Sequence, residues 1–192
     1  MKIGIFGGSF NPPHVMHKNL ALYLIKNKYL DKVIYVPTGN KYVKKDLIDV
    51  KYRLEMLKLM VEDINGLEVS AYERKKALIY TYQTLDYFKK LYPNDEIYFV
   101  CGSDNLREIK SWKNYKYILD NYKLLVVKRS NDDIEEMVGN LKSKNVIAVN
   151  IPCNIPISSS IIRKNIKLNQ NFEGLDLKVK KYIEKKNLYC RY

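Results

Sequence analysis

The sequence predicts an α/β fold in which helices cover both faces of a parallel sheet. Short apolar runs rich in β-branched residues recur along the chain and have the length of buried strands. Stretches with apolar residues at helical spacing lie between several of these runs. No internal repeat, low-complexity tract or linker interrupts the 192 residues. We therefore expect one domain spanning residues 1–192, with a doubly wound sheet and a C-terminal helical segment from about Pro156.

Apolar runs that alternate with helical stretches are typical of strand–helix–strand units with parallel strands. Ligands of such sheets bind beyond the carboxyl ends of the strands, so we expect functional residues directly after them. The predicted strands are 2–6 (KIGIF), 32–37 (KVIYVP), 67–70 (LEVS), 96–101 (EIYFVC), 123–128 (KLLVVK) and 145–150 (NVIAVN).

Two of the intervening stretches show a clear helical period. Residues 50–64 and 81–92 each place their apolar residues on one face, and Pro93 stops the second helix. The two apolar faces consist of Val50, Leu54, Leu57, Val61 and Ile64, and of Tyr82, Leu85, Phe88 and Tyr92.

The composition is that of a folded globular chain, with 46% hydrophobic and 29% charged residues. No apolar stretch approaches the roughly 20 residues that span a bilayer, and the apolar run at residues 3–6 is too short for a signal peptide. The 3 cysteines form no C-x-x-C pair, which argues against a disulfide framework or a zinc knuckle. We expect a cytoplasmic protein, in a reducing environment, that does not bind a membrane.

The chain carries a net charge of +13, from 34 basic and 21 acidic residues. Most lysines sit in pairs on predicted helix surfaces, and no basic tail or arginine-rich arm is present. This pattern favours a solvated surface that attracts small anions, and no nucleic-acid partner is expected. A basic nucleic-acid-binding protein is the non-enzymatic alternative.

The most unusual stretch is GGSFNPPHVMH, residues 7–17, which contains both histidines of the chain. The glycines follow a predicted strand and let main-chain N–H groups approach a ligand closely. A helix beginning near His14 directs its positive dipole end to the same place, and His14 and His17 share one face of its first turn. The arrangement suits an anion with several oxygens. With no third histidine we expect no metal site; the plainer alternative is a capped helix with surface histidines.

A second stretch, IPISSSIIRKNI at residues 155–166, has a related composition. Ser158 and Ser159 at a helix start offer hydroxyl and amide N–H groups to phosphate oxygens. Arg163 adds a planar guanidinium that can hold two such oxygens. Taken alone, the stretch is equally consistent with a serine N-cap followed by a surface arginine.

Both stretches resemble signatures of the nucleotidylyltransferase superfamily. GGSFNPPHVMH is similar to the T/H-x-G-H signature in the form found in nicotinate-nucleotide adenylyltransferases, with Met16 where that family has glycine. IPISSSIIRKNI is similar to the family's I-S-S-T-x-I-R segment near its end. The resemblance implies a Rossmann-like fold of nucleotidylyltransferase type. It also implies adenylyl transfer from ATP to nicotinate mononucleotide in NAD biosynthesis, with Mg²⁺ accompanying ATP.

The resemblance extends to VCGSDNLREIKSW from Val100 and to ALIYTYQTL from Ala77, and it implies a set of site residues. The catalytic residues would be His14, His17 and Arg163. ATP would be bound by Gly7, Gly8, Ser9, Phe10, Gly102, Asp104, Arg129, Ser158 and Ser159. The mononucleotide would be bound by Asn40, Lys44, Lys45, Tyr80, Thr81 and Trp112.

The acceptor half of this site departs from the family pattern. After residues 32–37 the family reads N-P-P-H-K, whereas this chain has Asn40, Lys41, Lys44 and Lys45 and no histidine. Any of the lysines could anchor a phosphate. Trp112 stacks on nicotinate by family analogy, but a core tryptophan is the alternative. Adenylyl or cytidylyl transfer to nicotinamide mononucleotide or phosphopantetheine is therefore an alternative function, and a homo-oligomer is left open.

Overall fold

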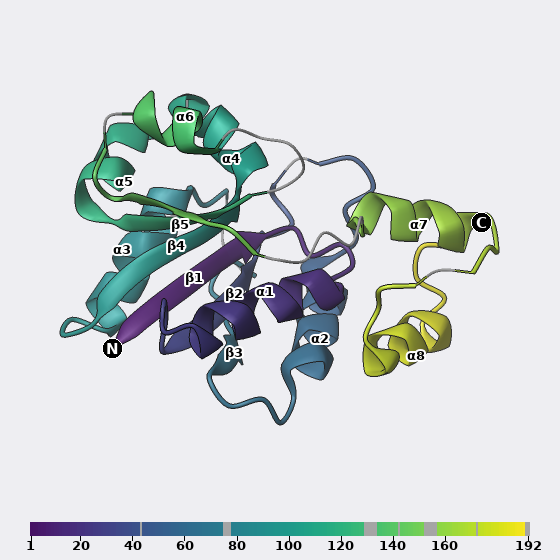
Figure 1. Cartoon of the computed structure of the whole chain (residues 1–192). Helices are drawn as coiled ribbons and strands as arrows, with labels where there is room; N and C mark the ends of the chain where they lie inside the picture. Colours follow the sequence, from purple (N-terminus) through teal and green to yellow (C-terminus); the bar gives the residue numbers. More distant parts are fainter. Residues whose placement is uncertain are drawn as a thin grey trace.

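A single parallel sheet organises the molecule. The computed structural model describes residues 1–42, 44–74, 78–128, 134–141, 143–151, 157–171 and 173–190. Its six strands pair in parallel in the order β3-β2-β1-β4-β5-β6 (Figure 1). This order confirms the predicted doubly wound sheet, and every predicted strand is present. The strands are β1 (Lys2–Gly8), β2 (Lys32–Pro37), β3 (Leu67–Val69), β4 (Glu96–Gly102), β5 (Lys123–Val127) and β6 (Val146–Val149).

Helices connect the strands and follow the last one. Both periodic stretches form helices, but the first ends at Val61 because Glu62 leaves the helical conformation with ψ of 133°. The short helices α4 to α6 were not predicted individually, since six or seven residues show little periodicity. The helices are α1 (Val15–Lys26), α2 (Val50–Val61), α3 (Thr81–Leu91), α4 (Ser103–Glu108), the 3₁₀ turn η1 (Ile109–Ser111), α5 (Tyr115–Asn121), α6 (Ile134–Gly139), α7 (Ser159–Lys167) and α8 (Leu177–Lys185).

The core has two layers, one on each face of the sheet. On one face, helices α1 and α2 pack their apolar sides against the sheet, α8 packs on α2, and apolar side chains of α7 and α8 complete the same layer (Figure 1). On the other, helices α3 to α6 cover the central strands. The first layer includes Leu24, Met56, Leu57, Ile162 and Val179, and the second includes Leu85, Phe88, Leu106, Ile118 and Leu124.

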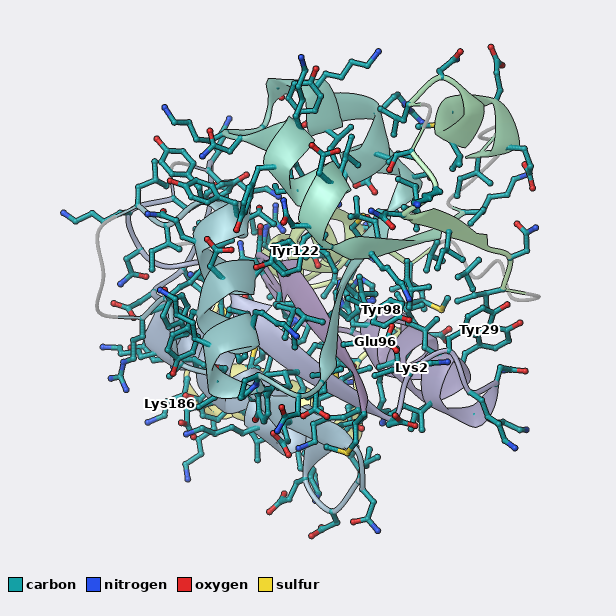
Figure 2. The ribbon with its side chains drawn as sticks, turned by 90° about the vertical axis from the view of Figure 1, so that its left-hand side faces the viewer. Lys2, Tyr29, Glu96, Tyr98, Tyr122 and Lys186 are labelled. Carbon is teal, nitrogen blue, oxygen red and sulfur yellow. The ribbon has the colours of Figure 1, made fainter. Side chains whose placement is uncertain are left out.

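At the amino-terminal ends of the strands lies a surface cluster of polar side chains. Glu96 accepts hydrogen bonds from Lys123 (2.7 Å) and from the hydroxyl of Tyr98 (3.1 Å). These contacts lower the pKa of the Glu96 carboxyl group. Figure 2 shows Glu96 and Tyr98 close to Lys2 at this end. The cluster lies at the opposite end of the sheet from the residues singled out in the sequence.

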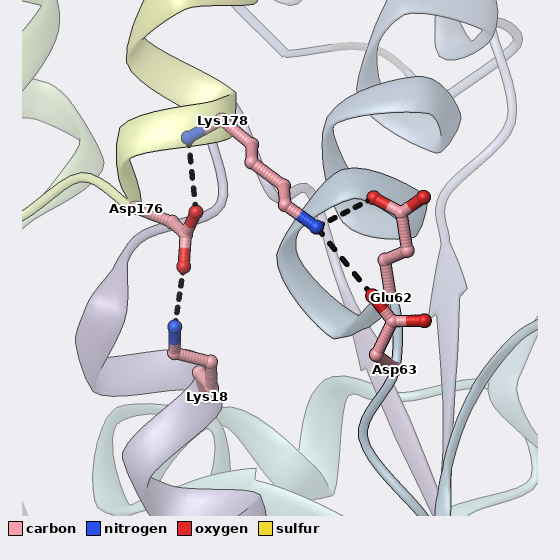
Figure 3. Close-up of polar contacts among 5 residues, drawn as sticks. All are labelled: Lys18, Glu62, Asp63, Asp176 and Lys178. Atoms are coloured by element: carbon pink, nitrogen blue, oxygen red, sulfur yellow. Dashed lines mark hydrogen bonds and ion pairs between the residues drawn. The ribbon is translucent and has the colours of Figure 1, made fainter.

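The C-terminal helices are attached to α1 and α2 beside the start of α1. Asp176 pairs with Lys18 of α1, and Lys178 of α8 reaches Glu62 (2.8 Å) and Asp63 (3.7 Å) after α2 (Figure 3). The amide of Val15 donates to the carbonyl of Gly174 at 2.8 Å. These contacts bring the end of the chain to the carboxyl edge of β1.

Candidate functional site

The two unusual stretches meet at the carboxyl end of β1. Arg163 of α7 donates from Nη1 to the carbonyl oxygen of Asn11 at 2.7 Å. The Ser159 hydroxyl donates to the carbonyl oxygen of Pro12 at 2.8 Å. Segments about 150 positions apart in the chain therefore form one corner, as the sequence predicted. We call the segment after β1, residues 9–14, the first loop.

The paired histidines have a fixed arrangement at the start of α1. The amide of His14 donates to Nδ1 of His17 at 3.1 Å, and the two rings lie 3.8 Å apart. When Nδ1 of a neutral imidazole accepts, its hydrogen is on Nε2. Nε2 of His17 is thus the donor atom of the ring. His14 is 5% exposed and His17 is half-buried, so solvent reaches His17 more readily.

Two aromatic side chains pack against the imidazole ring of His17. Phe10 packs edge-on against the imidazole with a centroid distance of 5.0 Å, and Phe6 lies 5.9 Å away. Phe10 is only 3% exposed, so only its main chain can face a nucleotide. Its φ of 45° lies in the left-handed region, which is strained for a non-glycine residue. A Cβ on Gly8 would lie 3.1 Å from the Phe10 ring, so a larger residue at position 8 would press on this ring.

Both helices that start at the corner direct amide N–H groups toward it. His14 is the N-cap of α1 and Ser158 the N-cap of α7. The Ser158 hydroxyl oxygen accepts from the amide of Ile161 at 3.2 Å, which is the capping role named as the alternative. The helix dipoles place partial positive charge at both ends. Together with the half-buried Arg163, they make the corner attractive to anions.

The second loop, residues 38–49 between β2 and α2, carries the predicted acceptor residues. The Asn40 side chain accepts from the amide of Val50 at 2.7 Å, so its carbonyl group caps the start of α2. Lys44 donates from Nζ to the Ser9 hydroxyl at 3.2 Å, whereas Lys41 and Lys45 are exposed to solvent. Of the three lysines, the structure thus brings Lys44 to the first loop.

Further predicted site residues follow β4. Gly102 is the buried N-cap of α4, and Asp104 is exposed in its first turn. Trp112 is half-buried and packs edge-on against Phe99 at 5.6 Å. The Phe99 ring in turn lies 3.1 Å from the position of a Cβ on Gly7. Trp112 is thus partly in the core and partly exposed to solvent.

The predicted nicotinate-binding amides lie at the start of α3. The amide of Tyr80 donates to Oε1 of Gln83 at 3.0 Å, and Thr81 is the first residue of the helix. A ligand carboxylate at the Tyr80 amide would displace the Gln83 side chain. Arg129, expected near the nucleotide, lies outside the described residues.

Sequence reasoning missed three buried polar residues that build the corner. Asn11 accepts from the Tyr189 hydroxyl (2.9 Å) and donates to the carbonyl of Asp46 (2.7 Å). Burial raises the pKa of Tyr189, which keeps its hydroxyl protonated as a donor. Arg53 is 0% exposed and contacts both loops. A signal for Arg53 existed, because it lies on the apolar face of α2 beside Leu54 and Leu57.

The groups at the corner are donors and positive charges. Across the described part of the chain, no group of three or more His, Cys, Asp or Glu side chains is arranged to hold a metal ion. A divalent cation that accompanies a nucleotide would meet phosphate oxygens and water here. Also within the described residues, no helix is both long and apolar enough to cross a membrane.

A donor-lined corner beyond β1, next to the point where the strand order reverses between β1 and β4, is suited to a nucleotide's phosphates. Together, the fold and the paired histidines define an enzyme of the nucleotidyltransferase class. The model of the family described as "Cytidylyltransferase-like" matches residues 5–165. That match includes both unusual stretches almost completely.

Full-length relatives narrow the class. A protein of Acholeplasma laidlawii named "Probable nicotinate-nucleotide adenylyltransferase" is 39% identical, with 96% of each chain covered. One of Caldicellulosiruptor bescii with the same name is 37% identical over 100% of both chains. The solved nicotinic acid mononucleotide adenylyltransferase of Plasmodium falciparum in complex with NaAD shares the fold, with a TM-score of 0.85, 24% identity, and 98% and 97% coverage. The chain belongs to the cytidylyltransferase-like family and, within it, to the nicotinate-nucleotide adenylyltransferases.

Proposed function

We propose that this chain transfers the adenylyl group of ATP to nicotinate mononucleotide, forming nicotinate adenine dinucleotide and pyrophosphate. The observation that carries the proposal is the meeting of the two stretches at one corner through the Arg163–Asn11 and Ser159–Pro12 hydrogen bonds. The names of the full-length relatives support the same reaction. We expect the reaction to take place in the cytoplasm, with no nucleic acid or membrane involved.

The chemistry requires positioning more than proton transfer. A phosphate oxygen of the mononucleotide attacks the α-phosphorus of ATP, and the bond to the bridging oxygen of the β-phosphate breaks. The electron pair of that bond leaves with pyrophosphate. Because the second pKa of a phosphate monoester is about 6, the nucleophile is already ionised near neutral pH. The enzyme therefore needs neither a general base nor a protein nucleophile.

Each group at the corner then has a role with the phosphate chain of ATP. The Nε2–H of His17 donates to an oxygen of the transferred phosphate, and His14 holds the ring in place through its amide. Arg163, with one Nη donating to Asn11, uses its other N–H groups on the β- and γ-phosphates. The first-turn amides of α7 join it. Mg²⁺ enters as part of the ATP substrate and neutralises phosphate charge.

The acceptor lies across the second loop. Lys44, already beside Ser9, anchors the mononucleotide phosphate near the first loop. The first-turn amides of α3 and the accessible part of Trp112 face the pyridine and its carboxylate. Asn40 contributes indirectly, since its side chain fixes the start of α2.

An acceptor panel tests this function. Purified protein with Mg²⁺ and ATP is given nicotinate mononucleotide, nicotinamide mononucleotide or phosphopantetheine, and pyrophosphate release is measured. We expect turnover with the nicotinate form to exceed the other two by at least about tenfold, a difference of about 1.4 kcal/mol. Faster release with either of the others would replace the proposed acceptor. No release with any of them would overturn the function itself.

A further inference from the structure

A fully buried arginine joins the two loops on which the proposed reaction depends. Arg53 of α2 donates from Nε to the carbonyl of Ile48 (2.9 Å) and from Nη2 to that of Thr38 (2.7 Å), both in the second loop. From Nη1 it donates to the carbonyl of Ser9 (2.8 Å) in the first loop. A fourth, longer contact reaches the Thr38 hydroxyl at 3.5 Å.

Stability alone does not account for an arginine at this place. Moving a guanidinium out of water is costly, and packed apolar side chains often replace buried charges without loss of stability. Burial lowers the pKa of Arg53 to about 10, so the group is charged at neutral pH. The carboxylates of Asp49 and Glu73 act on it through space, but its described hydrogen bonds all go to main-chain or hydroxyl oxygens.

The shape of the guanidinium explains the choice of residue. Its donors form a rigid planar fork, so three carbonyl groups bound to it are held at fixed positions relative to one another. A lysine is a point charge on a flexible stem and cannot fix three acceptors in one plane. Arg53 therefore sets the distance between the first loop and the second.

We propose that Arg53 is a positioning residue that holds the phosphate-binding first loop and the acceptor-binding second loop in register for in-line attack. This inference rests on the proposed function, because it assigns ATP and the acceptor to the two loops. Two neighbouring hydrogen bonds between the loops support it. The Lys44 ammonium group donates to the Ser9 hydroxyl, and the Asn11 side-chain amide donates to the carbonyl of Asp46. Arg53 is the most deeply buried member of this set of loop-to-loop contacts, at 0% exposed against 4% for Asn11.

The proposal predicts that substitutions of Arg53 lower kcat while the KM values change little. Each substrate alone lies mainly on one loop, so the KM for ATP and for the acceptor should each change less than about threefold. The reaction needs both loops in place, and a misplacement of about 1 Å can cost about a hundredfold in rate. We expect Arg53→Lys and Arg53→Met to lower kcat per folded molecule by about 30- to 100-fold.

A matched control separates positioning from general destabilisation. Ile118→Ala creates a cavity under α5 on the opposite face of the sheet, away from both loops. It should lower the Tm but leave kcat per folded molecule within twofold of the wild type. If Arg53→Lys also keeps kcat within twofold while the wild type is active, the positioning role is wrong. If Arg53→Met does not fold, the lysine variant decides.

A second measurement needs no substrate and so is independent of the proposed function. Amide hydrogen exchange is followed in residues 9–11 and 38–42 of the wild type, Arg53→Lys and Ile118→Ala. We expect faster exchange in both segments for Arg53→Lys and in neither for Ile118→Ala. Unchanged exchange in either segment of Arg53→Lys would overturn the inference. A wild type without turnover would instead overturn the proposed reaction, and the exchange result would still decide whether Arg53 joins the loops.

Discussion

Replacing His17 tests the geometry of the corner most directly, because its two ring nitrogens have separate roles. Nδ1 accepts from the amide of His14 at 3.1 Å, and Nε2 is the nitrogen that we propose donates to phosphate. Removing one preorganised donor from an active site costs about 10²–10³ in rate, or about 2.7–4 kcal/mol. We therefore expect His17→Ala to lower kcat/KM by at least about a hundredfold.

The same substitution should affect stability much less. The ring loses one hydrogen bond, worth about 0.5–1.5 kcal/mol, and its contacts with Phe6 and Phe10. The bond from the Tyr35 hydroxyl goes to the His17 main-chain carbonyl at 2.9 Å and is retained. For a chain of this size about 1 kcal/mol shifts the Tm by about 2–4 °C, so thermal unfolding should show a decrease of only a few degrees.

Two further variants separate the ring nitrogens. In His17→Asn the side-chain oxygen can take the place of Nδ1 and accept from His14, but nothing replaces Nε2. In His17→Gln an amide N–H lies near the position of Nε2. We expect the asparagine variant to recover Tm but not turnover, and the glutamine variant to be the more active. Turnover of His17→Asn within about threefold of the wild type would refute the donor role of Nε2.

Four other predictions follow from contacts around the site. Gly39→Ala should destabilise the chain by about 1–3 kcal/mol, because a Cβ there would lie 2.4 Å from the Glu73 carbonyl oxygen. The loss should appear as a lower urea midpoint of unfolding, and an unchanged midpoint would show that the second loop can shift to accommodate the Cβ. Burial raises the pKa of the Glu73 carboxyl, so its ionisation opposes folding and wild-type stability falls as pH rises through the native pKa. Glu73→Gln should therefore gain stability relative to the wild type as the pH rises above the pKa of an unfolded glutamate, about 4.3, and a difference that does not change with pH would contradict this. Trp112→Ala should raise the KM for the mononucleotide far more than that for ATP, and equal effects on both would assign the ring to the core. Tyr189→Phe should cost about 1–2 kcal/mol in chemical unfolding by leaving the Asn11 side-chain oxygen without this donor, whereas full stability would show that the bond contributes nothing.

The strands and the corner were predictable because their signals are local. Each strand is a short β-branched run, and a parallel order places the residues that follow each run at one edge of the sheet. The amide-rich starts of α1 and α7 were recognised from glycine, serine and histidine in their first turns. The resemblance assigned residues of both stretches to one nucleotide site, and the Arg163–Asn11 bond shows that the two stretches lie together.

What the sequence did not reveal depends on side-chain partners far away in the chain. Asn40 is predicted to bind the mononucleotide, and the sequence did not show that its oxygen also accepts from the first amide of a helix ten positions later. Phe10 lies in a motif of ligand-binding residues, yet its left-handed backbone turns the ring into the core. The position of Arg53 on the apolar face of α2 signals burial, but only the path of two loops shows what its guanidinium binds there. Such partners follow from tertiary contacts that no local pattern encodes.

The hydrogen bond between Tyr189 and Asn11 also has a consequence for synthesis on the ribosome. The two residues are 178 positions apart, so at about 5–20 residues per second Asn11 is translated roughly 9–36 s before its partner. After the last strand is made at residue 149, a nascent chain has all strands and both histidines but still lacks this contact of the corner. Translation products that stop before residue 189 therefore cannot form the complete corner, whatever part of the sheet they have already folded.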